Sequence, residues 1–263
     1  MTATARLRRA AREPPLRVVA WQHPEWWLVP IIGAAWLGLG AAALVRATTG
    51  SPTSEFATMF VCPIVPRTPA GFEPTAAAAG TLAAPAMVVA MMGPLVLPAL
   101  HHVGASGLWA RRERGPSLVF AGVLAAWIPV IWGIDLAVAM VAGTVGAVTA
   151  VVATVALAVA WQLSAWRLRA LRSCVRTVAL PPRGRRADVA CLSYGLLLGR
   201  SCVLSCVGLM AVVAAAGHGL VAMAAVAAVQ LHERQARGPR PRRLPGLLVA
   251  LAIGALAVAQ TSA

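Results

Sequence analysis

Sulfur-bearing side chains recur at helical spacing in one apolar stretch of the sequence. Cys202, Cys206 and Met210 are spaced four residues apart, so they would share one face of an α-helix. Thiolate and thioether groups are the ligands that select Cu(I), whereas hard cations prefer carboxylate oxygens. The pattern therefore indicates a soft-metal site, although buried cysteine and methionine are also common as ordinary core residues.

A second apolar stretch carries Met87 and Met91 on one face, followed by Pro94 and Pro98. A proline within a helix removes the hydrogen bond to the carbonyl four residues earlier and bends the chain. In lipid, the carbonyl freed in this way must find a partner inside the protein or line a polar cavity. We therefore expect a bent helix with Met91 beside the bend.

These sulfur ligands would lie at matched depths in a membrane. Met91 and Cys206 would each lie roughly 15 Å from the outer end of their helix, and Met87 and Met210 roughly 8–9 Å. Met223, in a third apolar stretch, falls at a similar outer depth. If these three helices touch, the soft ligands form a ladder that suits Cu(I). The predicted metal ligands are Cys202, Cys206, Met210, Met91, Met87 and Met223.

The sequence offers no signature of catalysis. It contains no phosphate-binding glycine loop, no paired catalytic carboxylates and no HExxH pattern, so we expect a protein that is not an enzyme. Cys174 is expected to be an isolated reduced thiol. His101 and His102 are expected to be ordinary residues at the membrane boundary.

Two acidic residues and one outer loop complete the set of candidates. Asp135 is expected in an outer turn where water can solvate it, and Glu233 is expected to pair with a nearby arginine. Met59 and Cys62, in the loop 46–80, form a Met-x-x-Cys pattern that could offer an outer soft-metal contact.

The composition indicates an integral membrane protein. A soluble domain carries about 25% charged residues, whereas this chain of 263 residues has 12% charged and 59% hydrophobic residues. Too few charges remain to cover a water-facing surface, so the excess apolar surface must face lipid. This excludes a soluble enzyme, a disordered tail and a secreted scaffold built on disulfides.

The apolar residues gather in segments of the length that a membrane helix needs, roughly 17–25 residues. We therefore predict an all-α polytopic membrane helix bundle with six to seven transmembrane helices. The last two segments are the least certain spans, because one is short and the other is rich in Gly and Ala. The predicted segments are Trp27–Val45, Thr81–Leu100, Ser117–Ile134, Leu136–Trp161, Leu196–Ala216, Gly219–Leu231 and Leu244–Ala259.

The arginines indicate how this bundle is oriented. Twenty of the 23 basic residues, all of them arginine, lie in residues 1–26, 104–116, 162–190 and 232–243. The opposite connections hold only Arg46 and Arg67, and Arg200 lies within a segment. Cytoplasmic loops of membrane proteins carry such an excess of positive charge. We therefore expect a cytoplasmic N-terminus and location in a bacterial cytoplasmic (inner) membrane.

The same placement decides the domains and the partners. Residues 1–26 are expected to be a basic cytoplasmic tail with interfacial tryptophans, and residues 27–260 a single transmembrane domain. A net charge of +15 could suggest a nucleic-acid partner, but its distribution over alternate loops favours contact with anionic lipid. We expect the lipid bilayer as a partner and no nucleic acid.

Four stretches carry motifs in a fixed order. They are Ala90–Pro94 with Pro98, Gln162–Cys174, Gly195–Met210 and Gly217–Arg234. Their order and spacing, over residues 87–243, resemble a family of predicted metal-binding integral membrane proteins, some of which are labelled copper chaperones. The resemblance implies a helical membrane fold that handles a soft metal.

The sequence departs from that family's pattern at five positions. Ala170 and Ser205 stand where the family has cysteines, Leu198 where it often has histidine, Val207 where it has tryptophan, and Ala165 where it has proline. The chain thus keeps only part of the family's soft ligands. It is either a divergent member with weaker metal binding or one that has kept the scaffold alone.

We expect an integral membrane protein that binds or hands on a soft metal ion, with Cu(I) as the expected cargo and a metal donor or acceptor protein as a possible partner. The alternative is a non-catalytic membrane scaffold or accessory subunit with buried structural cysteines. A thiol redox protein is disfavoured, because Cys202 and Cys206 are not a Cys-x-x-Cys pair and their helical spacing is near the upper limit for a disulfide.

Overall fold

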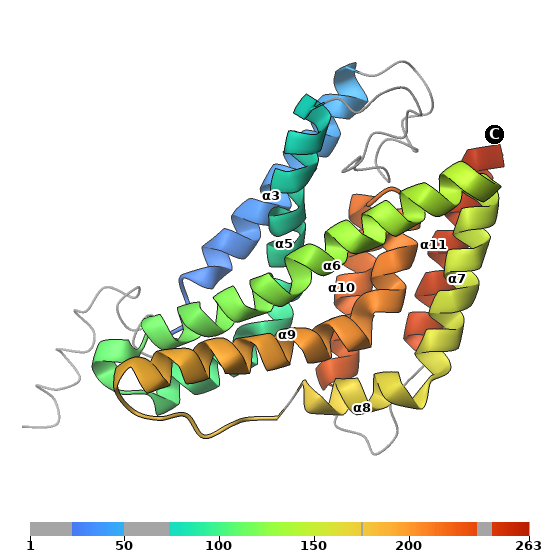
Figure 1. Cartoon of the computed structure of the whole chain (residues 1–263). Coiled ribbons are helices and arrows are strands. Elements are labelled where there is room, and N and C mark those ends of the chain that lie inside the picture. The colour runs from blue at the N-terminus through green and yellow to red at the C-terminus, as the bar shows by residue number, and fades with distance from the viewer. Residues whose placement is uncertain (1–22, 50–73, 175, 236–243, 263) are drawn as a thin grey trace, which may run out of the picture.

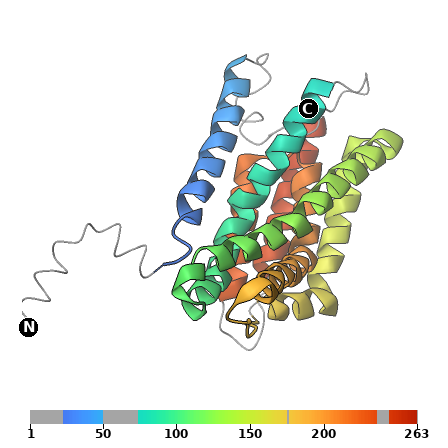
Figure 2. The ribbon, with the colours of Figure 1, turned by 60° about the vertical axis from the view of Figure 1, so that its left-hand side comes forward.

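The computed structural model describes residues 23–49, 74–174, 176–235 and 244–262, and these residues form helices and connections without any strand. The all-α prediction is confirmed for this part of the chain. Figure 1 shows the arrangement, and Figure 2 shows it turned so that α9 is seen nearly end-on. The helices are α3 (Leu28–Thr49), α5 (Pro74–Ser106), α6 (Arg114–Val145), α7 (Ala147–Leu163), α8 (Ala165–Ser173), α9 (Gly184–Ala215), α10 (Leu220–Gln235) and α11 (Leu244–Ser262), with a 3₁₀ turn η1 (Trp109–Arg111) before α6.

The helices α6 and α9 form the most extensive contact of the fold. Glycines on both helices allow their backbones to meet, because a Cβ on Gly122 would lie 2.6 Å from the carbonyl oxygen of Leu192. A Cβ on Gly195 would overlap the carbonyl of Val119 in the same way. Small residues at such positions are typical of helix pairs that pack closely in membranes. This contact fixes α9, which carries three of the predicted metal ligands, Cys202, Cys206 and Met210, against the body of the molecule.

Fewer helices could cross a membrane than the sequence predicted. Three of the described helices are long and apolar enough, namely α6, α9 and the part of α5 from Ala84 to Ser106. The pair α7 and α8 makes a fourth if the two, bent by 67° at their junction, count as one span. The prediction of six to seven spans is therefore not supported, since three to four candidate spans are present among the described residues.

The difference has a physical origin in the remaining helices. In α3 and α11, the apolar stretches with described side chains, Leu28–Leu44 and Leu244–Ala259, are shorter than the three long spans. The helix α10 has 16 residues and carries His232 and Arg234 in its last turn. A hydrocarbon core about 30 Å thick requires about 20 predominantly apolar residues at 1.5 Å per residue, and α10 falls short of that length.

The turn that was expected at Asp135 is also absent from the structure. The helix α6 runs through this residue without interruption and ends at Val145, and the chain turns at Gly146, whose φ is 86°. Asp135 is buried, and its carboxylate lies 2.7 Å from Nε2 of His218, which belongs to the turn between α9 and α10. A carboxylate with a buried partner can lie inside a helix bundle. The charge of Asp135 therefore does not mark the end of a helix.

The helix α5 continues through Pro94 and Pro98. The carbonyl of Ala90, which loses its helical partner to Pro94, accepts a hydrogen bond of 3.0 Å from the indole Nε1 of Trp36 on α3. The expectation that a freed carbonyl is satisfied inside the protein is met here by a neighbouring helix. Residues 1–22 of the basic tail, together with Met59 and Cys62, lie outside the described residues.

Candidate metal centre

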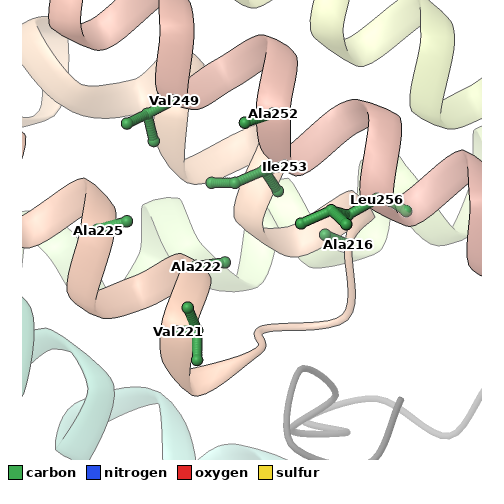
Figure 3. Close-up of a pocket in the computed structure, with 9 residues that line it drawn as sticks. Ala216, Val221, Ala222, Ala225, Val249, Ala252, Ile253 and Leu256 are labelled. Carbon is green, nitrogen blue, oxygen red and sulfur yellow. The ribbon is translucent and has the colours of Figure 1, made fainter. Parts of the chain in front are cut away.

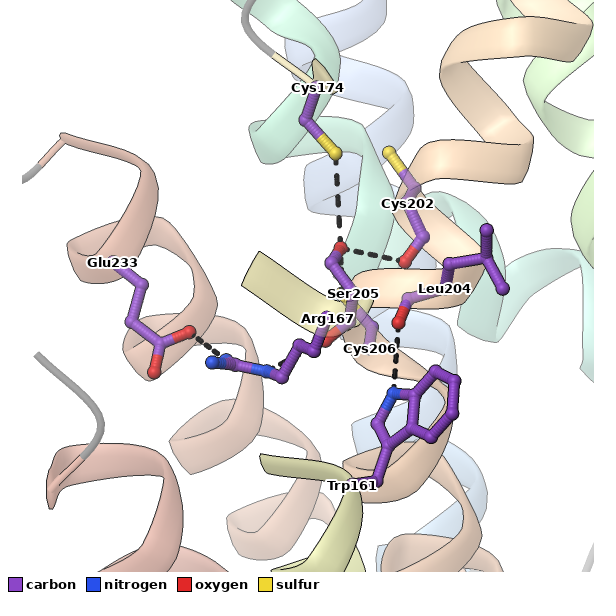
Figure 4. Close-up of polar contacts among 8 residues, drawn as sticks. All are labelled: Trp161, Arg167, Cys174, Cys202, Leu204, Ser205, Cys206 and Glu233. Atoms are coloured by element: carbon purple, nitrogen blue, oxygen red, sulfur yellow. Dashed lines mark hydrogen bonds and ion pairs between the residues drawn. The ribbon is translucent and has the colours of Figure 1, made fainter. Parts of the chain in front are cut away.

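Three cysteines from two parts of the chain meet around one serine. Cys202, Ser205 and Cys206 lie on α9, and Cys174 follows the last residue of α8. The hydroxyl of Ser205 lies 3.4 Å from Sγ of Cys206 and 3.8 Å from Sγ of Cys174, and it donates to the carbonyl of Cys202 at 2.9 Å. Figure 4 shows the sulfurs of Cys174 and Cys202 on the same side of this hydroxyl. We call these four residues the thiol cluster.

The thiol cluster is closed to solvent. Cys202 and Cys206 are fully buried, Ser205 is 1% exposed and Cys174 is 6% exposed. None of the cysteines in the described part of the chain forms a disulfide. The pKa of the Cys174 thiol is raised well above its ordinary value. The larger cause is a hydrogen bond to Cys202, and the smaller cause is burial. The cluster therefore presents reduced sulfur groups to one another in a dry environment.

The position of Cys174 depends on how α8 is attached to α9. Ser164 caps α8 by accepting a hydrogen bond of 3.2 Å from the backbone N–H of Arg167, as short polar residues at an N-cap commonly do. At the other end of α8, the hydroxyl of Ser173 donates to that of Ser201 on α9 at 2.9 Å. Between them, Nε of Arg167 donates to the carbonyl of Ser205 at 3.2 Å. These contacts bring Cys174 against the face of α9 that carries Cys202.

Arg234 connects α10 to both of the neighbouring helices. Its guanidinium donates to Sγ of Cys202 at 2.9 Å and to the carbonyl of Leu95 on α5 at 3.2 Å. A guanidinium is always charged and holds its donors in a fixed fork. Arg234 therefore places a positive charge next to Sγ of Cys202. Its bond to Leu95 also brings the part of α5 around Met91 towards Cys202.

A buried ion pair lies beside the cluster. Arg167 on α8 pairs with the carboxylate of Glu233 on α10, and both side chains are nearly inaccessible to solvent. Burial raises the pKa of Glu233, and the neighbouring Arg167 opposes that rise. The expectation that Glu233 has an arginine partner is confirmed. The pair ties α8 to α10 next to the thiols, as Figure 4 shows.

The predicted methionine ligands lie in the same core but outside these polar contacts. Met87, Met91, Met210 and Met223 are each at most 2% exposed and belong to one core cluster with the three cysteines. The helix α10, which carries Met223, packs against both α5 and α9, whereas α5 and α9 have little direct contact. The ladder of ligands required contacts among α5, α9 and α10, and the contacts of α10 with α5 and with α9 are present.

Sequence reasoning gave too little weight to Cys174, Ser205 and Arg234. Cys174 was expected to be isolated, yet it contacts Ser205 and Cys202. A signal was available, because all three residues stand within the motifs that carried the family resemblance. The sequence could not show the bend between α7 and α8, which brings Cys174 against α9.

A cavity between α10 and α11 lies elsewhere and has different chemistry. It is lined only by apolar side chains of α10 and α11 together with Ala216, among them Val221, Ile253 and Leu256 (Figure 3). Such a surface offers no ligand to a metal ion. The candidate centre is therefore the thiol cluster.

The comparisons with known proteins agree with this chemistry. A family model described as PpoB2, copper chaperone, matches residues 84–258, which is more than half of the chain. The chain belongs to this family. Neither the curated proteins nor the solved structures yield a match. The part shared with the PpoB2 family begins at Ala84 on α5 and ends in α11, so it contains the whole thiol cluster and Arg234, but not α3.

Proposed function

We propose that this member of the PpoB2 family binds Cu(I) as cargo in the thiol cluster, within a membrane, and hands it to a partner protein. The observation that carries the proposal is the meeting of three reduced thiols around Ser205 in a site without solvent. Soft sulfur ligands favour Cu(I) over harder ions. No chemical turnover is part of the proposed function.

The charges around the thiol cluster support a monovalent cargo. Two thiolates and one Cu(I) ion carry a net charge of −1, and the guanidinium of Arg234 at 2.9 Å from Sγ of Cys202 would compensate it. An uncompensated charge in a buried site is costly. Arg167 is already paired with Glu233, so Arg234 is the cation that accompanies the bound metal.

The buried methionines provide a second kind of ligand along the same core. The Leu95–Arg234–Cys202 bridge brings α5 close to the thiol cluster, and Met91 lies one helical turn before Leu95. Thioethers are neutral ligands for soft ions, so they do not change the charge balance. We infer that Met87, Met91, Met210 and Met223 offer weaker sites through which copper leaves or reaches the thiols.

The alternative is a membrane scaffold whose cysteines are merely buried. The side chain of Arg234 supports copper binding over the scaffold, because its guanidinium at Sγ of Cys202 would compensate the charge of a thiolate-bound Cu(I) ion. The three to four long apolar helices support a location in a membrane under either interpretation. We propose that this membrane is the bacterial inner membrane.

The function is tested by Cu(I) binding to the tag-free, detergent-purified chain. We expect the Cys202→Ser/Cys206→Ser double variant to lose most of the bound copper, and Cys174→Ser to lose affinity by about tenfold, or 1.4 kcal/mol. Cys191→Ser is the matched control, since Cys191 is also a buried thiol on α9 but lies outside the cluster. Unchanged copper binding in the double variant, with the fold intact by circular dichroism, would favour the scaffold.

A further inference from the structure

A second group of metal-ligating side chains lies where α3 begins and α5 ends. It consists of His23, Glu25 and His101, whose ligand atoms all lie within 4.8 Å of one another. Nδ1 of His23 lies 3.1 Å from Oε1 of Glu25, and Nδ1 of His101 lies 3.2 Å from Oε1 and 3.1 Å from Oε2. We call these three residues the imidazole cluster.

The backbone before α3 holds two members of this cluster in place. A turn over residues 23–28 is closed by the N–H of Trp26 donating to the carbonyl of His23 at 3.0 Å and the N–H of Leu28 donating to that of Glu25 at 2.9 Å. His23 and Glu25 are therefore fixed relative to each other by the main chain. Such fixed placement reduces the ordering cost of binding a ligand.

Close packing at a glycine fixes this turn relative to α5. A Cβ on Gly104 would lie 2.5 Å from Cβ of Pro24, so the turn can approach α5 only because residue 104 has no side chain. His101 stands three residues earlier on α5 and so lies on the adjacent surface of that helix. The three ligand atoms thus converge from two separately held elements.

The geometry points to a site for a divalent first-row metal ion, and we propose that the imidazole cluster binds Zn²⁺ or Cu²⁺. Imidazole nitrogen with one carboxylate suits these borderline ions rather than Cu(I). Metal–ligand bonds of about 2.0–2.2 Å place the ligand atoms of a tetrahedral ion roughly 3.3 Å apart. The three His–Glu distances of 3.1–3.2 Å are close to that spacing.

The exposure of the cluster suits an exchangeable ion. The side chains of His23 and His101 are 54% and 44% exposed, whereas that of Glu25 is 11% exposed. The carboxylate therefore lies on the buried side of the cluster. The exposed side leaves a coordination position for water or for a ligand from another protein. This proposal does not depend on the thiol cluster, with which it shares no residue.

The first experiment uses Cu²⁺ as a spectroscopic probe on the tag-free, full-length chain in detergent. All five cysteines of the chain are changed to serine so that thiols cannot reduce the probe. We expect one bound Cu²⁺ whose electron paramagnetic resonance spectrum shows coupling to two nitrogens, and which displaces Zn²⁺ from the same site because imidazole and carboxylate ligands bind Cu²⁺ more tightly. His23→Gln or His101→Gln should weaken binding at least tenfold, whereas the control His102→Gln should not.

A second experiment keeps the thiols intact in case the serine variant does not fold. The number of Zn²⁺ ions bound by the unmodified chain should fall by one in His101→Gln and remain unchanged in His102→Gln. Equal binding by these two variants, or a Cu²⁺ spectrum without nitrogen coupling, would overturn the imidazole site. Neither result would bear on Cu(I) binding by the thiols, because the test reads a different ion at different residues.

Discussion

The thiol cluster and the imidazole cluster contrast in chemistry, burial and attachment. The first gathers three thiols around Ser205 in a site closed to solvent, and the guanidinium of Arg234 donates to one of them. The second gathers two half-exposed imidazoles around one carboxylate. Both touch α5, since Arg234 bonds to the carbonyl of Leu95 and His101 follows six residues later, about 9 Å along the helix.

If both proposals hold, one bundle keeps two kinds of metal apart. Soft sulfur ligands in a dry site favour Cu(I), and imidazoles with a carboxylate in a wet site favour divalent ions. The thiol cluster depends on three helices docking through buried charges, whereas the imidazole cluster depends on one backbone turn and Gly104. Perturbations of the two regions should therefore have separate effects.

The largest difference between the regions is expected from the ion pair beside the thiols. Glu233→Gln leaves Arg167 buried without its partner, and breaking a buried pair costs about 3–5 kcal/mol. We expect a lower thermal unfolding temperature and loss of Cu(I) binding, because Arg167 also attaches α8 to α9. Thermal unfolding followed by circular dichroism measures the first effect.

A double variant separates charge from packing in that experiment. Arg167→Met/Glu233→Gln removes both charges and should recover most of the lost stability, while Cu(I) binding stays weak because α8 has lost its contact with the carbonyl of Ser205. Copper binding restored together with stability would show that α8 does not position Cys174.

A gain of function is expected at the centre of the thiol cluster. The hydroxyl of Ser205 lies within 3.4–3.8 Å of two sulfurs, so Ser205→Cys adds a thiol at the point where the ligands converge. We expect Cu(I) affinity to rise by about tenfold, or 1.4 kcal/mol, with Zn²⁺ binding at the imidazole cluster unchanged. A competition titration with a Cu(I) chelator measures the change, and unaltered affinity would place the copper away from residue 205.

The pH dependence of copper binding should reveal the buried thiol. The raised pKa of Cys174 keeps this thiol protonated near neutral pH, so binding as a thiolate must release its proton. Affinity for Cu(I) is therefore expected to rise with pH, by about tenfold per pH unit for each proton released. The slope should fall by one proton in Cys174→Ser, and a slope that is the same in this variant would exclude Cys174 as a thiolate ligand.

The smallest expected effect concerns the imidazole cluster alone. Gly104→Ala forces Pro24 away from α5 and so shifts His23 and Glu25 relative to His101. We expect Zn²⁺ affinity to fall several-fold while Cu(I) affinity stays the same. Equal losses for both ions would mean that the two clusters are coupled through α5.

The sequence predicted local chemistry better than tertiary placement. The helical spacing of Cys202, Cys206 and Met210 and the burial of the methionines follow from the apolar pattern, and the structure places all of them in one core. The sequence indicated that the carbonyl of Ala90 would find a partner inside the protein, but not that this partner would be Trp36. These features depend only on periodicity and on the cost of burying polar groups.

Contacts between distant segments could not be predicted in the same way. His23 and His101 are far apart in the sequence, and the packing of α3 on α5, with Pro24 against Gly104, brings them together. Asp135 appeared to mark a turn because its partner, His218, lies in another part of the chain. Likewise, the 67° bend after α7 decides the role of Cys174, and no residue pattern within α8 shows its direction.

The central claim, that thiols of this cluster hold Cu(I), is tested most directly by X-ray absorption at the copper edge of the Cu(I)-loaded, full-length chain. We expect two to three sulfur atoms at about 2.3 Å, taking the zinc–thiolate distance as a guide, and loss of this shell in Cys202→Ser/Cys206→Ser. A shell of nitrogen and oxygen alone, or a sulfur shell that persists unchanged in the double variant, would contradict the assignment.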